Sequence, residues 1–175
     1  MFKRLFGRPP YEDASHALYT TIIGQSRRPE FYTDLAVADS VDGRFDLVAL
    51  HVFLVLHRLG HDNRKELSQA LFDLMFADMD MNLREMGVAD TGVGVRVKKM
   101  VSALYGRIDA YEKALDDADA MQAALARNLY RGESVPSPIL AAMSAYVLEQ
   151  ARVLASQAIG DLEKGRVRFS APAMP

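Results

Sequence analysis

The chain has 175 residues, half of them hydrophobic, with a net charge of −2 and no cysteine. This length suits one domain that buries roughly 70% of its unfolded surface, so folding needs neither a metal nor a disulfide. The absence of cysteine excludes thiol catalysis, Cys-ligated zinc and iron–sulfur clusters, and the near-neutral charge provides no general attraction to nucleic acid.

The first ten residues, MFKRLFGRPP, are basic and carry three apolar side chains. They lack the apolar core of about 7–15 residues that a secretory signal needs. We expect residues 1–10 to form a flexible, solvated tip, with contact to a membrane surface or a ribosome as the alternative. The longest apolar stretch, residues 47–56, is half the roughly 20 residues that span a bilayer. No segment is therefore expected to cross a membrane.

Apolar residues recur at steps of three and four along most of the chain, which predicts helices and no strand. The helix over residues 45–59 is apolar on nearly all sides, as is typical of the central helix of a bundle. Asn63 and Glu66 have the spacing of a capping box, and Gly87 is expected to close the helix that follows. The expected helices cover about residues 11–25, 29–36, 45–59, 63–86, 95 to at least 115, and 139–157.

The helix that begins near residue 95 either continues past Asp116 and Asp117 or breaks there, and Pro138 begins the last helix. These elements predict one all-α domain, an irregular bundle of about six helices over residues 11–165. A flexible tail is expected over residues 166–175.

Residues 76–92, FADMDMNLREMGVADTG, begin with the Asp-x-Asp-x-Asn spacing of a calcium loop. An EF-hand loop also needs glycine at its sixth position and glutamate at its twelfth, where this chain has Leu83 and Ala89. On the predicted helix Asp78 and Asp80 point in nearly opposite directions, so they cannot share one metal ion. A calcium site is excluded.

Asp78 falls with Asn82 and Glu85 among the apolar positions of the same helix. Burying a carboxylate without a partner is costly. We therefore expect Asp78 and Glu85 to form a structural ion pair with a base of the next helix, Arg96 in particular. Contact with a partner protein is the alternative.

The histidines and the glycine-rich stretch give weaker patterns. His57 and His61 stand one turn apart but have no third ligand at a diagnostic spacing, and His51 is expected to be a hydrogen-bonded core histidine. TGVGVRVKK, residues 91–99, lacks the third glycine and the preceding strand of a dinucleotide loop. No catalytic residue, cofactor or metal is predicted. A haem- or small-ligand-binding module that uses His51 or His57 is the alternative function.

Five of the nine methionines lie between residues 75 and 100. Methionine fills irregular gaps in cores and is also frequent on adaptable binding surfaces. Both interpretations, core packing and a binding surface, stay open for Met75, Met79, Met81, Met86 and Met100.

The motif D-x-D-x-x-L-R-E-x-G over residues 78–87 is followed by a basic helix start with Arg96, Lys98 and Lys99, and then by Tyr105-Gly106-Arg107. Together with FDLVALHVFLVLHRL, residues 45–59, these stretches resemble the ubiquinol–cytochrome c chaperone family. The resemblance extends over most of the chain.

The resemblance implies an all-helical, non-enzymatic assembly chaperone for respiratory complex III, with newly made cytochrome b as its client. A second assembly factor is a further implied partner, and nucleic acid is not. Residues 1–10 make no mitochondrial presequence, which favours a bacterial cytoplasmic form, peripheral to the inner membrane. Because the client is a membrane protein, its binding surface would be apolar, adaptable and rimmed by charge. We expect the partner contacts at Met79, Met81, Arg84, Lys98, Tyr105 and Arg107.

Overall fold

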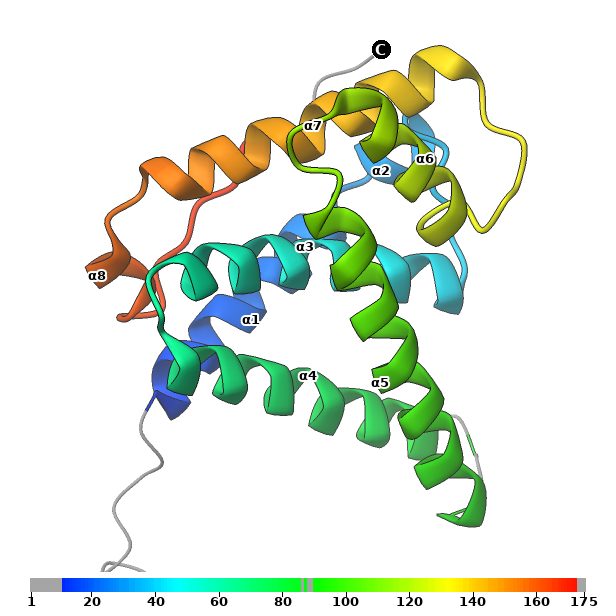
Figure 1. The fold of residues 1–175 in the computed structure, drawn as a ribbon. Coiled ribbons are helices and arrows are strands. Elements are labelled where there is room, and N and C mark those ends of the chain that lie inside the picture. The colour runs from blue at the N-terminus through cyan, green and yellow to red at the C-terminus, as the bar shows by residue number, and fades with distance from the viewer. Residues whose placement is uncertain (1–10, 86, 88–89, 173–175) are drawn as a thin grey trace, which may run out of the picture.

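Figure 1 shows the computed structural model, which describes residues 11–85, 87 and 90–172; the tip over residues 1–10 lies outside the described residues. Within these ranges the chain forms eight helices and no strand, which confirms the all-α prediction. The two helices beyond the expected six are an eleven-residue helix over Ala118–Asn128 and a single turn over Ile159–Leu162. The helices are α1 (Glu12–Ser26), α2 (Glu30–Thr33), α3 (Val41–His61), α4 (Lys65–Glu85), α5 (Asp90–Glu112), α6 (Ala118–Asn128), α7 (Ser137–Ser156) and α8 (Ile159–Leu162).

The centre of the bundle is α3, which packs against α1, α4, α5 and α7. In Figure 1 it lies between α7 above and α4 below, and α5 rises beside it from α4 toward α6. Nearly every side chain from Leu47 to Val55 is buried. Each buried leucine or valine of this run contributes about 1.5–3 kcal/mol. The apolar pattern on all sides of residues 45–59 thus predicted the central helix correctly.

The junction between α3 and α4 differs from the expectation. Asn63 has a φ of 56°, in the left-handed region, and the backbone N–H of Arg64 donates to the carbonyl of Leu59 at 2.9 Å. This is the geometry that ends a helix, whereas a capping residue at a helix start has extended backbone. Asn63 therefore terminates α3 and does not cap α4.

The boundaries of α4, α5 and α6 can be compared with those that the sequence predicted. Gly87 ends α4 as expected, with a φ of 80° and its N–H donating to the carbonyl of Arg84 at 2.9 Å. The next helix begins at Asp90, about five residues earlier than expected. The chain does break after α5, because the Asp117 carboxylate accepts from the backbone of Asp119 and Ala120 and so begins α6.

His51 is a fully buried, hydrogen-bonded core residue, as expected. Its Nδ1 lies 2.8 Å from the carbonyl oxygen of Leu47 and its Nε2 lies 2.8 Å from the hydroxyl of Tyr146 on α7. Since a carbonyl only accepts, Nδ1 carries the proton and Nε2 accepts from Tyr146, whose oxygen in turn accepts from Gln25 at 2.9 Å. Burial lowers the pKa of the imidazole to about 4.

The last described residues lie against the bundle, although the sequence predicted a flexible tail from residue 166. The ring of Phe169 packs edge-on to His51, with centroids 5.4 Å apart. Three glutamine side chains hold the backbone of this segment: Gln25 donates to the Ser170 carbonyl at 2.8 Å, Gln150 accepts from the Ser170 N–H at 2.8 Å, and Gln157 accepts from the Arg168 N–H at 2.9 Å. The prediction of a flexible tail is wrong for residues 166–172, and residues 173–175 lie outside the described residues.

Asp46, on α3, is a buried carboxylate that the sequence analysis did not single out. It has no exposed surface, and its two oxygens accept from Arg107 on α5 at 2.7 Å and from Arg131, in the loop after α6, at 2.6 Å. Arg131 also reaches Asp42 at 2.8 Å. Burial raises the pKa of Asp46, while the two arginines act in the opposite direction. These ion pairs fix α5 and the α6–α7 loop to α3.

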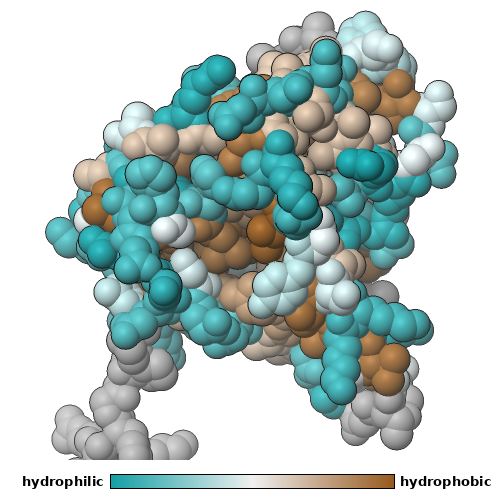
Figure 2. Space-filling view, in the orientation of Figure 1, coloured by the Kyte–Doolittle hydropathy of each residue, from teal (hydrophilic) through white to brown (hydrophobic). Residues whose placement is uncertain are grey.

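On the face shown in Figure 2 the surface is mostly hydrophilic, and apolar side chains gather in a hollow between the levels of α3 and α4. Among the described residues, no helix combines the length and the apolar character needed to cross a bilayer.

The free energy of unfolding should fall as the pH drops from about 6.5 to about 4. In this window His51 binds a proton in the unfolded chain but not in the folded one, so acid favours unfolding, by about 3 kcal/mol over the whole window. Urea denaturation at a series of pH values measures this loss. His51→Gln should flatten the dependence, whereas the exposed His16→Gln should leave it unchanged. An equal slope in His51→Gln and the wild type would contradict the assignment.

Asp46→Asn should destabilise the fold by roughly 3–5 kcal/mol, because it leaves the largely buried Arg107 without its counter-charge. Asp42→Asn is the matched control. Asp42 is 69% exposed and, in the described part of the chain, forms an ion pair with Arg131 only, so its loss should cost less than about 1 kcal/mol. Urea denaturation at neutral pH compares the two variants, and equal losses would show that Asp46 does not anchor the bundle.

Candidate functional site

Two hollows adjoin where α1, α3, α4 and α5 meet. The first, of about 280 Å³, lies among α1, α3 and α4, and the second, of about 740 Å³, lies between the start of α3 and α5. Both are in or near the size range of small-ligand sites. They share Val41, Phe45, Leu83 and Met100 as lining residues, and we call the pair the α3–α4–α5 groove.

The first hollow has an apolar wall rich in methionine. Met75 and Met79 reach it from α4 and Met100 from α5, beside Ile23 of α1 and Val48 of α3. Three of the five clustered methionines therefore line one concave surface. Their flexible thioether side chains suit a surface that must adapt to ligands of different shape.

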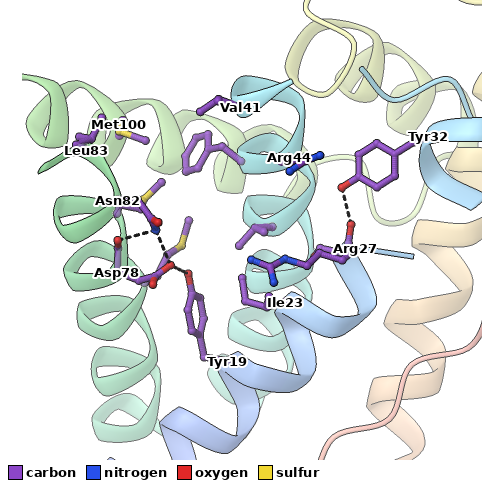
Figure 3. A pocket seen from close by; sticks show the side chains of 15 residues that line it. Tyr19, Ile23, Arg27, Tyr32, Val41, Arg44, Asp78, Asn82, Leu83 and Met100 are labelled. Carbon is purple, nitrogen blue, oxygen red and sulfur yellow. Dashed lines mark hydrogen bonds between the residues drawn. The ribbon is translucent and has the colours of Figure 1, made fainter. Parts of the chain in front are cut away.

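A row of polar side chains crosses this wall (Figure 3). Asp78 accepts a hydrogen bond from the Tyr19 hydroxyl at 2.9 Å and another from the Asn82 side chain at 3.2 Å. Burial, and then the charge of Asp78, raise the pKa of Tyr19. Asp78 thus lies among apolar neighbours, and its carboxylate is hydrogen-bonded by Tyr19 and Asn82.

The predicted ion pair at Asp78 is replaced by this contact with α1. The sequence pattern placed Asp78 on an inward side of α4, and in the structure that side faces α1 and not α5. Glu85 and Arg96 are both exposed. Among the described residues, no ion pair joins Asp78 or Glu85 to Arg96.

Basic side chains stand along the groove. In Figure 3, Arg27 and Arg44 lie across the first hollow from Asp78, and Arg44 pairs with Asp39 at 2.7 Å. The second hollow is lined by four further cations: Arg96, Lys99, Arg107 and Arg131.

The six predicted partner residues divide between the groove and other faces. Met79 lines the first hollow and Arg107 the second. The other four line neither hollow. Met81 is 54% exposed, Arg84 pairs with Asp80 at 2.6 Å, Tyr105 is exposed with its ring 5.4 Å from that of Phe72, and Lys98 is exposed.

The turn of α5 explains this division. At 100° per residue, Lys98 and Tyr105 fall on the side of α5 opposite Arg96 and Arg107. The six predicted partner residues come from one stretch of sequence, but they lie on two faces of the structure. Val41, which is 63% exposed and lines both hollows, was missed because it lies outside that stretch.

The histidines of the alternative function are engaged in contacts of their own. Both ring nitrogens of His51 are hydrogen-bonded inside the core, which leaves none for iron. Nδ1 of His57 lies 2.9 Å from the carboxylate of Glu112. In the described ranges, no group of three or more His, Cys, Asp or Glu side chains is placed to hold a metal ion.

Comparison with known proteins gives a consistent result. The sequence model described as "Ubiquinol-cytochrome C chaperone" matches residues 33–169. The crystal structure of the Cbp3 homolog from Brucella abortus is similar, with a TM-score of 0.82 and 35% identity over 97% of each chain.

Two animal proteins are more distant relatives. Ubiquinol-cytochrome-c reductase complex assembly factor 1 of Xenopus laevis is 24% identical over 144 residues, which are 81% of this chain and 72% of the frog protein. The Mus musculus protein of the same name is 26% identical over 160 residues, which are 89% of this chain. The match spans 54% of the mouse protein, about half its length.

The matched residues include all of α3, α4 and α5, whose contacts build the groove. The fold is shared along nearly the whole chain with the bacterial structure. The chain belongs to the ubiquinol–cytochrome c chaperone family.

Proposed function

We propose that this protein is an assembly factor for ubiquinol–cytochrome c reductase, and that it binds an apolar segment of newly made cytochrome b in the α3–α4–α5 groove. The observation that carries the proposal is the groove itself, a methionine-lined hollow with charged neighbours in a chain of this family. The names of the two animal relatives support the same process.

The groove has the chemistry that such a client needs. Segments of a membrane protein that are not yet inserted expose apolar side chains, and covering each one is worth about 1.5–3 kcal/mol. Met75, Met79 and Met100 can adapt to side chains of different shape. The Tyr19–Asp78–Asn82 row places polar groups at one side of the hollow, where they limit how a segment can lie. Binding and release of a client require no catalytic group.

The exposed residues outside the groove form a second proposed contact surface. Met81 and Arg84 on α4, with Lys98 and Tyr105 on α5, combine apolar and basic character. We assign these residues to a second assembly factor. Because cytochrome b is a membrane protein, the encounter takes place at the surface of the inner membrane.

A photoreactive side chain placed at Val41 should crosslink to cytochrome b in cells, because Val41 is exposed and lines both hollows of the groove. The same probe at Met81, which is comparably exposed but lines neither hollow, is the matched control and should give little of this product. Mass spectrometry of the crosslinked band identifies the partner. A cytochrome b crosslink from Met81 and none from Val41 would move the client from the groove to the surface around Met81.

Deletion of the gene should lower the level of cytochrome b, measured by immunoblot and by the absorbance of its haem. Normal levels in the deletion strain, together with no crosslink from either position, would overturn the proposed function.

A further inference from the structure

We propose that the second hollow of the α3–α4–α5 groove recognises acidic side chains that flank the apolar segment of the client. This inference rests on the proposed function. It further specifies that the client segment bound in the groove carries negative charge at one end. It follows from the distribution of charge around the two hollows.

The groove concentrates positive charge in a chain whose net charge is −2. Six cationic side chains line the two hollows, and four carboxylates line them or pair with those cations, which leaves a surplus of two positive charges. A positive cleft in a net-negative protein attracts anionic ligands selectively. The cations are Arg27, Arg44, Arg96, Lys99, Arg107 and Arg131, and the carboxylates are Asp39, Asp42, Asp46 and Asp78.

Arg96 and Lys99 supply the charge that is available to a ligand. Arg107 and Arg131 are engaged by Asp46, as described above. Arg96 and Lys99 are exposed, stand one turn apart on the same side of α5, and have no ion-pair partner in the part of the chain that the structure describes. A guanidinium and an ammonium at this spacing can each bond a carboxylate.

The start of α3 adds to the positive electrostatic potential of the second hollow. Ser40, Val41 and Asp42 line the second hollow, so the N-terminal end of a 21-residue helix opens into it. The helix dipole makes this end partly positive, and Asp42 offsets only part of the combined charge.

The arrangement of the two hollows determines where the apolar and the acidic residues of the bound segment lie. They share four lining residues, so a segment with its apolar side chains in the first hollow reaches the second with its adjoining residues. The ligand is therefore an apolar stretch with carboxylates at one end.

An anionic lipid is the competing occupant, since it also combines an apolar part with negative charge. The Tyr19–Asp78–Asn82 row argues against it, because an acyl chain in the first hollow would cover a carboxylate and offer it no hydrogen bond. A polypeptide has amide groups that can meet this row. We therefore assign the groove to a protein segment.

Binding of two fluorescent peptides to the full chain tests the inference. One is a soluble amphipathic helix with leucines at steps of three and four and two glutamates at one end, and the other has glutamines in their place. Anisotropy titrations should show tighter binding of the glutamate peptide. The ratio of the two dissociation constants, glutamine peptide over glutamate peptide, should fall about threefold to tenfold in the double variant Arg96→Gln/Lys99→Gln. In the wild type this ratio should decrease as the salt concentration is raised.

Lys98→Gln is the matched control for Lys99→Gln. It removes the same charge from the neighbouring residue, which is also exposed but lies on a side of α5 away from the groove. Only Lys99→Gln should weaken binding of the glutamate peptide. An equal effect of the two variants would show general attraction to the protein's surface and overturn the inference.

Other outcomes separate this inference from the proposed function. Equal affinity for the two peptides, with the Val41 crosslink to cytochrome b intact, would refute acidic selection alone. Loss of the crosslink as well, together with normal cytochrome b levels in the deletion strain, would overturn the proposed function. Binding to phosphatidylglycerol vesicles that depends on Arg96 and Lys99, with no preference between the peptides, would assign the groove to a lipid instead.

Discussion

The carboxylate of Asp46 lies in the central helix at a point that solvent does not reach, and two arginines hold it there. Arg107 and Arg131 follow it by 61 and 85 residues, so the contact closes two long stretches of chain onto α3. If one partner is removed, the other keeps its charge in a poorly solvated place, which is strongly destabilising. An ion pair of this kind therefore restricts the position of the helices more closely than apolar contact alone. The position of α5 over α3 is therefore fixed by charge as well as by packing.

The groove is a consequence of that position. One wall is the start of α3, which contains Asp46, and the opposite wall is α5, which contains Arg107. Because Arg107 and Arg131 are engaged by Asp46, Arg96 and Lys99 are left to determine what the hollow attracts from outside. One helix thus supplies both an internal anchor and an external recognition surface, on residues only a few turns apart.

The sequence pattern predicted the properties that one helix has by itself. It identified the apolar central helix, the end of α4 at Gly87 and the placement of Asp78 among apolar neighbours. It could not identify partners across helices, because a helical wheel gives the side on which a residue lies and not the helix that faces it. Asp78 was therefore assigned to α5, although Tyr19 of α1 is its partner.

The same limit applies to the candidate site. Asp46 stands in an apolar run, and that was a signal, but nothing local connects it to Arg131. The motifs between residues 78 and 107 were correctly linked to the family, and Met79 and Arg107 do lie in the groove. Lys98 and Tyr105 were grouped with them because composition was considered without the turn of α5.

The glutamines that hold the end of the chain have a consequence for how this segment can vary. Gln25, Gln150 and Gln157 bond to amide and carbonyl groups of the main chain, which every residue type except proline provides in full. These hydrogen bonds should therefore tolerate other side chains at positions 168 and 170, whereas an inserted or deleted residue would shift the spacing of the bonded groups. At positions 168 and 170 these hydrogen bonds therefore constrain the length of the segment and not the type of residue, whereas Phe169 between them also packs through its side chain.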